Sequence, residues 1–214
     1  MLKQLLERTL NAFCEDYKAF SKHHYPTIHN RGLSLEHLSS AFLRRLLSIS
    51  KEFTQDTTAI LFSNDVAHQP SVYLFTFNNE KVWCIFPPFL NAKTEAKSQI
   101  YFCIEALIAT NQAKPNDHFI ILCDHWFDRT KSSKALYYWW TGHQPLLIND
   151  YLIQGIHPLK TPELLSDVLK VQYEMEPITL SITHPIESKQ HQSLLKYFLC
   201  FALLQYKAQP SFPS

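Results

Sequence analysis

The first part of the chain carries apolar residues at helical spacing. They recur three or four positions apart over residues 2–22, which predicts an amphipathic helix. Residues 23–33 contain proline, asparagine and glycine, which predicts a loop. Ser34 is a suitable N-cap for a second helix. The buried face of that helix would carry Leu35, Leu38, Phe42, Leu46 and Ile49.

Strand patterns follow these two helices. Thr57–Ser63 is short and apolar, which is typical of a strand. Ser71–Phe77 and Lys81–Phe86 are rich in β-forming residues and flank Asn78-Asn79-Glu80, a turn signal, so the two segments predict a hairpin. Pro87 ends the second strand of this hairpin, because proline cannot donate a backbone hydrogen bond to a neighbouring strand.

The remaining patterns predict further helices and strands. Thr94 would cap a helix to about Asn111, and His118–Cys123 is typical of a buried strand. Beyond it we expect an aromatic segment over 132–140, a strand near 146–153, a helix from Thr161, a strand near 178–183 and a final helix over 187–206.

The predicted final helix is apolar on several sides. Its residues from Leu194 to Tyr206 are interrupted only by Lys196 and Gln205, so they exceed the ~100° stripe that a surface helix buries. Such a helix either inserts between earlier elements or is covered by another chain. We therefore expect a homodimer or a stable partner complex that includes this helix or the aromatic run before it. The interface candidates are Trp139, Trp140, Phe198 and Phe201.

Length and composition favour one folded domain. The 214 residues are 46% hydrophobic and 18% charged, which supplies a sizeable core. We expect a core over about 30–128, with the helix 2–22 before it and an α/β appendage over 129–214. The net charge of +1 excludes a strongly basic, tail-driven nucleic-acid binder. With three glycines, the chain lacks the GxGxxG, GxxxxGK[ST] and GxSxG motifs, which disfavours most nucleotide-cofactor enzymes and α/β-hydrolases.

The cysteines and the N-terminus predict a cytoplasmic protein. None of the five cysteines forms a CxxC pair, and four lie in apolar runs, as buried thiols do in a reducing compartment. The N-terminus has charges in its first turns and no continuous apolar signal region. The longest apolar stretch is shorter than the ~20 residues that a bilayer-spanning helix needs, so we expect no membrane association.

The order of the predicted elements resembles that of a known superfamily. From residue 34 to 123 the order is helix, strand, strand, strand, helix, strand, with a hairpin in the middle. This order, and the segment Asn30-Arg31-Gly32-Leu33-Ser34 running into Glu36, resembles the core of the restriction-endonuclease-like, or PD-(D/E)XK, nuclease superfamily. The resemblance covers less than half of the chain. It implies an α/β fold with a mixed central sheet of four or more strands flanked by helices, and a role in restriction, phage defence, repair or mobile-element biology.

The same resemblance implies a metal site that this chain does not reproduce. In the superfamily, an acidic residue of the second strand and an E-x-K motif of the third strand hold Mg²⁺ and orient a water molecule. The matching positions here carry Ser71 or Gln69, and then Ile85 and Pro87. Since apolar side chains cannot ligate Mg²⁺, we expect a non-catalytic nuclease-like protein, without a cofactor, that binds nucleic acid or a protein partner.

Two alternatives remain open at this point. The first is an active Mg²⁺-dependent nuclease whose site residues have migrated, with Glu36, Asp65, Glu95, Lys97 and Asp124 as the fallback catalytic set. A literal E-x-K does occur at Glu95-Ala96-Lys97, but in the first turn of a predicted helix, where an acidic residue is also favoured by the helix dipole. The second alternative is an immunity or adaptor protein with an unrelated α/β fold.

Two groups of cations are candidates for nucleic-acid binding. Residues 1–50 have a net charge of +3 (seven Lys or Arg, four Asp or Glu), and Arg31, Arg44 and Arg45 could form a basic face there. Arg129, Lys131 and Lys134 lead directly into the aromatic run, where cations and rings could grip phosphates and bases. The alternative for the first group is an ordinary solvated helix face. The alternative for the second group is a hydrophobic segment with a charged shoulder, buried in the core or in a protein interface.

The segment after the predicted buried strand is a further candidate site. Asp124, His125 and Asp128 follow that strand, where they could bind a metal or a polar ligand. The other interpretation is a capping aspartate and a loop anchored by Trp126.

Overall fold

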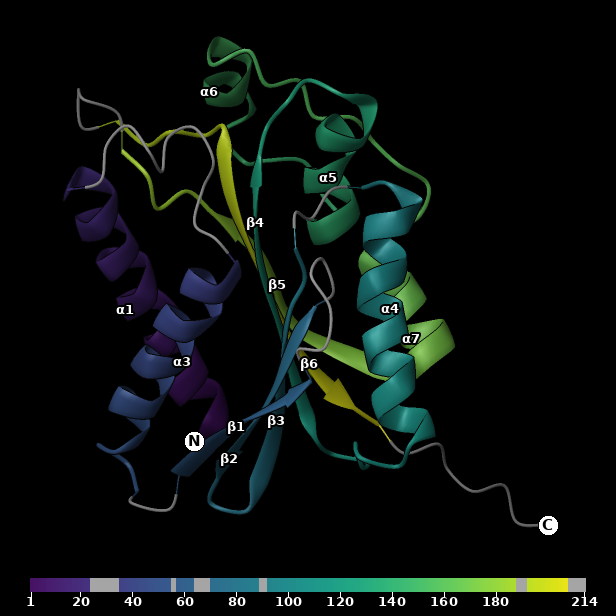
Figure 1. The fold of residues 1–214 in the computed structure, drawn as a ribbon. Coiled ribbons are helices and arrows are strands. Elements are labelled where there is room, and N and C mark those ends of the chain that lie inside the picture. The colour runs from purple at the N-terminus through teal and green to yellow at the C-terminus, as the bar shows by residue number, and fades with distance from the viewer. Residues whose placement is uncertain (24–34, 55–56, 64–69, 89–91, 188–191, 208–214) are drawn as a thin grey trace.

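The computed structural model describes residues 1–23, 35–54, 57–63, 70–88, 92–187 and 192–207. Within these ranges it contains six helices and six strands, which Figure 1 labels. In order they are α1 (Leu2–His23), α3 (Leu35–Ser50), β1 (Thr57–Ser63), β2 (Ser71–Phe77), β3 (Glu80–Phe86), α4 (Thr94–Ala109), β4 (His118–Trp126), α5 (Lys131–Thr141), α6 (Ile148–Ile153), α7 (Leu165–Tyr173), β5 (Met175–Thr183) and β6 (Tyr197–Tyr206).

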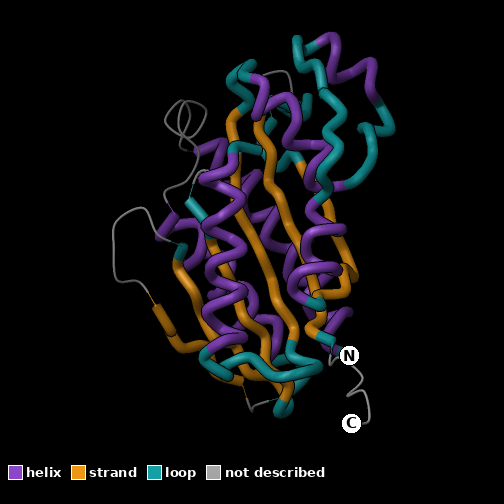
Figure 2. Tube along the Cα trace, turned by 90° about the vertical axis from the view of Figure 1, so that its right-hand side faces the viewer, coloured by secondary structure: helices purple, strands orange, loops and turns teal. Residues whose placement is uncertain are grey.

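One mixed sheet forms the middle layer of the molecule. Its strand order is β1-β2-β3-β4-β6-β5, and among these described strands β3 and β4 make the one parallel pair. Helices α1 and α3 cover one face, and α4, α5 and α7 cover the other (Figure 1). In the perpendicular view of Figure 2, the strands run side by side along the long axis of the molecule, with helices lying over them. The predicted mixed α/β class, with a central sheet of four or more strands flanked by helices, is confirmed.

The sheet separates two hydrophobic cores. One core joins α1 and α3 to the sheet through buried residues that include Phe13, Phe42 and Phe86. The other joins α4, α5 and α7 to the opposite face through residues that include Trp83 and Trp140. Because helices cover both faces, the inner strands are buried on both sides and are apolar almost without interruption.

The central hairpin depends on two asparagines. Asn78 and Asn79 have φ values of 48° and 65°, and Phe77 pairs with Glu80 across them. Positive φ at both central residues is the geometry of a two-residue turn whose twist matches that of the flanking strands, and asparagine tolerates it better than most residues. The predicted turn is confirmed, except that Glu80 already belongs to β3.

The predicted order of elements over residues 34–123 is confirmed. The helix α3, the strands β1, β2 and β3, the helix α4 and the strand β4 occur in that sequence, and β1 and β2 have the predicted bounds. The helix from Thr94 ends at Ala109, earlier than predicted, and its N-cap is Lys93. The predicted N-cap Ser34 lies outside the described residues, as does nearly all of the predicted loop 23–33.

The prediction of a final helix over 187–206 is wrong. Residues Tyr197–Tyr206 form the strand β6, which pairs with β4 on one side and β5 on the other. Its odd-numbered residues, such as Phe201, lie in the core beneath α1 and α3, and its even-numbered residues, such as Phe198, lie in the opposite core. A strand buried on both faces is apolar at every position, so its sequence has no alternation to distinguish it from a buried helix.

Two other predictions in the second half also need correction. The strand predicted near 146–153 is the short helix α6, of which Tyr151 is buried while Leu152 and Ile153 are exposed. The helix predicted from Thr161 begins at Leu165. The apolar spacing near 146–153 misled the prediction because most of these apolar side chains face solvent and not the core. The strand predicted near 178–183 is confirmed and begins earlier, at Met175.

The four residues proposed for an interface belong to the chain's own core. Trp139, Trp140, Phe198 and Phe201 are all buried, and Trp140 Nε1 donates a hydrogen bond to the Phe201 carbonyl oxygen over 3.3 Å. They are therefore not available on the surface of this chain, which corrects their assignment as interface residues. The apolar C-terminal segment inserts between earlier elements, as a strand.

The region expected to be an appendage is part of the same sheet. Strands β5 and β6 come from residues 129–214, yet β6 pairs along the whole length of β4.

Among the described residues, no helix combines the length and the apolar character needed to cross a membrane.

A core substitution in β6 tests this architecture. Phe201→Ala should lower the free energy of unfolding by about 3–5 kcal/mol, because it empties a buried site beneath α3. Val171→Ala, on the exposed side of α7, is the control and should change it by less than about 0.5 kcal/mol. Urea unfolding followed by circular dichroism measures both. Equal, small effects would contradict a buried central position for β6.

Candidate functional site

The described positions that the resemblance compares with metal ligands, Ser71, Ile85 and Pro87, are buried and carry no carboxylate. The register of the hairpin sets Ser71 opposite Phe86 and Val72 opposite Ile85. Ser71 and Ile85 are buried, as is Pro87 immediately after β3, and Gln69 lies outside the described residues. Isoleucine and proline side chains offer no oxygen to a divalent cation, so the described part of this hairpin end supplies no carboxylate ligand.

The described members of the fallback catalytic set do not converge. Glu36 is exposed in the first turn of α3, and Glu95 is exposed in the first turn of α4, on the opposite face of the sheet (Figure 1). Asp124 lies near the end of β4, and Asp65 lies outside the described residues. Within the described ranges, no group of three or more His, Cys, Asp or Glu side chains is placed to hold a metal ion.

The two charged residues of the literal E-x-K motif point to different sides of α4. Residues two positions apart on a helix point to different sides, and Glu95 and Lys97 do so here. Glu95 lines a groove between α4 and the strands, whereas Lys97 forms an ion pair with Glu163 and lies 5.0 Å from the centre of the Trp139 ring. The two side chains therefore do not act on one ligand.

Asp124 accepts a hydrogen bond from one of two buried tyrosines that are also hydrogen-bonded to each other. Tyr197 of β6 donates a hydrogen bond to Asp124 Oδ2 over 2.7 Å, and the Tyr17 and Tyr197 hydroxyl oxygens are 2.5 Å apart. Burial, together with the negative charge of Asp124, raises the pKa of the Tyr197 hydroxyl well above its usual value, so it remains a donor. This network connects α1, β4 and β6, and it gives Asp124 a structural partner in the core.

His125 contacts a serine that the sequence alone did not connect with it. The His125 Nε2 atom is 2.7 Å from Ser133 Oγ, and the same oxygen accepts the backbone N–H of Asp128 over 3.2 Å. Ser133 is 1% exposed. Although a serine beside a histidine is the arrangement of an activated nucleophile, a buried hydroxyl that already accepts a backbone hydrogen bond cannot reach a substrate.

Side-chain hydrogen bonds hold the loop between β4 and α5 and cap the start of α5. Thr130 is the N-cap of α5, and its hydroxyl oxygen accepts the Ser133 N–H. Burial alone would raise the pKa of Asp128, but hydrogen bonds from Thr130 and the nearby His125 outweigh it and lower that pKa. The interpretation of this segment as a capped loop is the one that these contacts support.

His184 and Tyr151 form a second histidine contact in this region. The His184 Nδ1 atom is 2.7 Å from the Tyr197 carbonyl oxygen, so Nδ1 carries the proton, and Nε2 accepts from the Tyr151 hydroxyl over 2.6 Å. Burial lowers the pKa of His184 to about 4. The imidazole is therefore neutral at neutral pH.

The cations proposed for nucleic-acid binding are split between the two faces of the sheet. Arg45 is paired with Asp16 through both carboxylate oxygens, and Arg44 Nε donates to the Ser40 carbonyl oxygen. Arg129, Lys131 and Lys134 lie at the start of α5, on the other side of the sheet from α3 (Figure 1). Arg31 lies outside the described residues. The described members of the two groups thus do not form one basic face.

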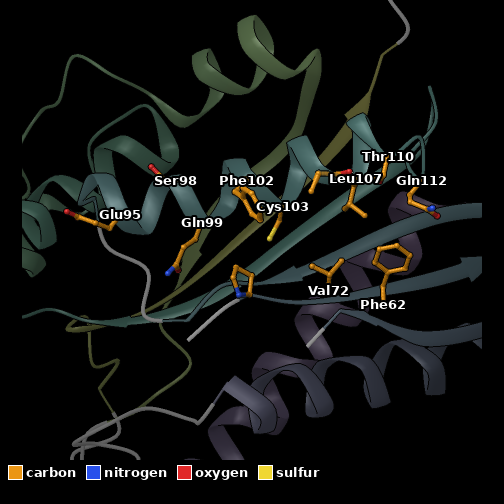
Figure 3. A pocket seen from close by; sticks show the side chains of 12 residues that line it. Phe62, Val72, Glu95, Ser98, Gln99, Phe102, Cys103, Leu107, Thr110 and Gln112 are labelled. Atoms are coloured by element: carbon orange, nitrogen blue, oxygen red, sulfur yellow. Dashed lines mark hydrogen bonds between the residues drawn. The ribbon is translucent and has the colours of Figure 1, made fainter. Parts of the chain in front are cut away.

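A surface groove lies between α4 and the first two strands. It has a volume of about 550 Å³, and one side of α4 faces Phe62 and Val72 across it (Figure 3). Pro70 also lines the groove. Its lining is mostly apolar, with Phe102 and Leu107 on the helix side and Glu95 near one end. This arrangement suits an uncharged, apolar chain segment better than a phosphate or a metal ion.

Sequence reasoning missed the residues that organise the polar contacts. Tyr17, Tyr197, Ser133, Tyr151 and His184 were not predicted to take part. Only the Thr130–Ser133 spacing carried a local signal, that of a helix N-cap. Tyr17 and Tyr197 are 180 positions apart, and no local pattern indicates that pairing.

Comparisons with known proteins leave the family open. No family model and no curated protein matches the sequence. Among solved structures, truncated TDP2 from Caenorhabditis elegans aligns with 9% identity and a TM-score of 0.31, over 71% of this chain and 66% of that chain, a little under two thirds. A humanized TDP2 from D. rerio aligns with 7% identity and a TM-score of 0.26, over 75% of this chain and 81% of that chain. Scores this low establish neither a shared fold nor a shared activity.

The tyrosine network makes a stability prediction. Tyr197→Phe should lower the free energy of unfolding by about 1–3 kcal/mol, because it removes the buried hydroxyl group that hydrogen-bonds both Asp124 and Tyr17. Tyr138→Phe, on the half-buried side of α5, is the matched control, with an expected change below about 0.5 kcal/mol. Urea unfolding at neutral pH compares the two. A Tyr197→Phe protein as stable as the wild type would show that the network contributes nothing.

His184 makes a prediction about pH. Its pKa is about 4 in the folded protein and near 6.5 when unfolded, so the unfolded chain binds the extra proton first as the pH falls. The contribution of neutral His184 to the free energy of unfolding is therefore fully present above pH ~6.5. It is lost progressively toward pH ~4, a decrease on the order of 2–3 kcal/mol.

The variant His184→Gln isolates this contribution. Its unfolding free energy should fall less between pH ~7.5 and ~5 than that of the wild type, since glutamine does not titrate. His157→Gln, at an exposed histidine, is the control and should retain the wild-type pH dependence. If both variants show the wild-type pH dependence, His184 is not the titrating group.

Proposed function

We propose that this chain is a catalytically silent protein of the PD-(D/E)XK type that acts by binding a protein partner. The observation that carries the proposal is the identity and burial of Ser71, Ile85 and Pro87, at the strand positions where that superfamily holds its metal. The order and direction of the strands support the fold assignment. Strands β1, β2 and β3 form an antiparallel meander, and β4 returns parallel to β3 after the helix α4.

The alternative of a migrated nuclease site has less support. A two-metal or one-metal phosphodiesterase needs carboxylates that share a cation, usually with a lysine nearby. Here Glu36 and Glu95 lie on opposite faces of the sheet, Lys97 is paired with Glu163, and Asp124 accepts a hydrogen bond from Tyr197. The described residues therefore offer no set from which such a site could be assembled.

A protein partner fits the surface better than nucleic acid. Sequence-independent binding of nucleic acid depends on several cations that neutralise neighbouring phosphates. In this chain the net charge is +1, Arg45 is paired with Asp16, and the cations at α5 lie across the sheet from α3. By contrast, an apolar groove and exposed aliphatic side chains are features of protein-binding surfaces.

A cleavage assay tests the catalytic half of the proposal. Purified protein with Mg²⁺ or Mn²⁺ should not cut duplex DNA, single-stranded DNA or RNA above the level of a mock preparation, because no described carboxylates converge on a cation. Cleavage that copurifies with the protein and disappears in Glu36→Gln, Glu95→Gln or Asp124→Asn would establish a migrated site and overturn the proposal.

A binding assay tests the other half. Fluorescence anisotropy with labelled DNA and RNA should show at most weak binding that physiological salt abolishes, since the phosphate contacts would be few. Partners captured from the native host should survive treatment of the extract with nucleases. Tight, salt-resistant binding to nucleic acid that is lost in Arg129→Gln or Lys131→Gln would favour a nucleic-acid partner instead.

A further inference from the structure

We propose that the outer edge of β1 is a homodimerisation site, at which β1 of a second copy pairs antiparallel to extend the sheet across a two-fold axis. This inference goes beyond the proposed function and does not depend on it. It follows from the chemistry of the strand edge, from the exposed side chains beside it and from the contrast with the other edge of the same sheet.

The main chain of β1 defines the kind of partner. Among the described residues, β1 is the outermost strand, paired with β2 on its inner side. The outer edge of such a strand presents backbone N–H and C=O groups at regular spacing, and another extended strand satisfies them best. The sequence Thr57–Ser63 contains no charged residue and no proline, which are the residues that usually prevent strand addition. Its register with β2 is regular from Thr57 to Leu61 and shifts only before Ser63.

The opposite edge of the sheet is protected. Strand β5 contains Pro177, and its pairing with β6 shifts between Pro177 and Thr179, close to the start of the strand. It also carries Glu176, which forms an ion pair with Lys170 over 3.2 Å. Proline and charged side chains each discourage the addition of a strand. The two edges thus differ in the properties that decide whether a sheet continues into a neighbouring molecule.

Large apolar side chains are exposed beside the free edge. Ile60 is 60% exposed, Phe62 45% and, on the facing side of α4, Phe102 67%. Ile60 pairs with Leu74 and the Phe62 ring contacts the Trp83 ring, and both of these partners pack in the core under α4. Ile60 and Phe62 therefore lie on the α4 side of the sheet, where Phe62 and Phe102 both line the groove. A strand added beyond β1 would set its own side chains next to Ile60 and Phe62 and cover the open side of this groove.

A second copy of the chain matches these requirements. In antiparallel pairing about a two-fold axis, each β1 presents the same surface to the other, so the contact is self-complementary and closes at two copies. Because Thr57–Ser63 is uncharged, this arrangement brings no like charges of the strand together. The strand also brings apolar residues at alternate positions, Ile60 and Phe62, to the exposed apolar surface of its partner. A phosphate-bearing ligand would find no cation in the strand.

The oligomeric state of the full chain provides the test. Sedimentation velocity of the wild type at micromolar concentration should give about twice the mass of the 25.0 kDa chain. Ile60→Lys should raise the dimer dissociation constant by at least about ten-fold, because antiparallel pairing places two lysines close to the two-fold axis. Ile153→Lys is the matched control. It makes the same change at another solvent-accessible isoleucine, 83% exposed on α6, and should leave the dimer intact.

Each outcome bears on the proposal. Circular dichroism establishes that both variants are folded, which their exposed positions favour. A wild-type protein that remains monomeric at high micromolar concentration would overturn the inference. So would a dimer that resists Ile60→Lys, or one that Ile153→Lys disrupts while Ile60→Lys does not, since the interface would then lie elsewhere. None of these results bears on nuclease activity, so the catalytic half of the proposed function stands or falls separately.

Discussion

Backbone pairing of β6 with β4 on one side and β5 on the other organises both halves of the molecule. Along this strand, alternate side chains enter the core under α1 and α3 and the core under α4, α5 and α7. The strand also carries Tyr197, whose hydroxyl group joins Asp124 of β4 to Tyr17 of α1. Loss of this one strand would open both cores and the polar network together, because each depends on its alternation.

The same burial constrains what the protein can do. A metal-dependent nuclease keeps carboxylates at strand ends that water and substrate can reach. Here the corresponding strand ends are part of the packed interior, and the polar groups nearby are engaged by tyrosines, by a capped loop and by backbone atoms. The proposed binding function therefore rests on the surface of the chain. Among the described residues, the edge of β1, the groove beside α4 and the helix α6 all expose large apolar side chains.

Much of the fold could be predicted from the sequence, and the reasons for the failures are physical. The bounds of β1 and β2 follow from apolar runs between turn signals, and the two asparagines of the hairpin identify its turn. The strand β6 could not be distinguished from a helix, because burial on both faces removes the alternation of apolar and polar residues. The helix α6 escaped prediction because its aliphatic residues are largely exposed, so their spacing does not report on the core.

The candidate site was less predictable than the fold. Once the order of elements indicated which positions correspond to metal ligands, the sequence itself showed that Ser71, Ile85 and Pro87 are not acidic. The partners of Asp124 and His125 could not, since Tyr17, Tyr197 and Ser133 come from other elements and only the tertiary structure brings them together. Pairings of this kind are set by sheet register, which a single sequence specifies only through its turns and its hydrophobic pattern.

The central proposal is that this chain holds no catalytic cation, and calorimetric titration of Mn²⁺ into metal-free protein tests it most directly. Hard divalent cations need several oxygen ligands at one point, and the described residues supply no such group. The account predicts heats equal to those of dilution into buffer. Saturable binding of one or two ions per chain with a sub-millimolar dissociation constant, weakened by Glu36→Gln or Asp124→Asn, would contradict it.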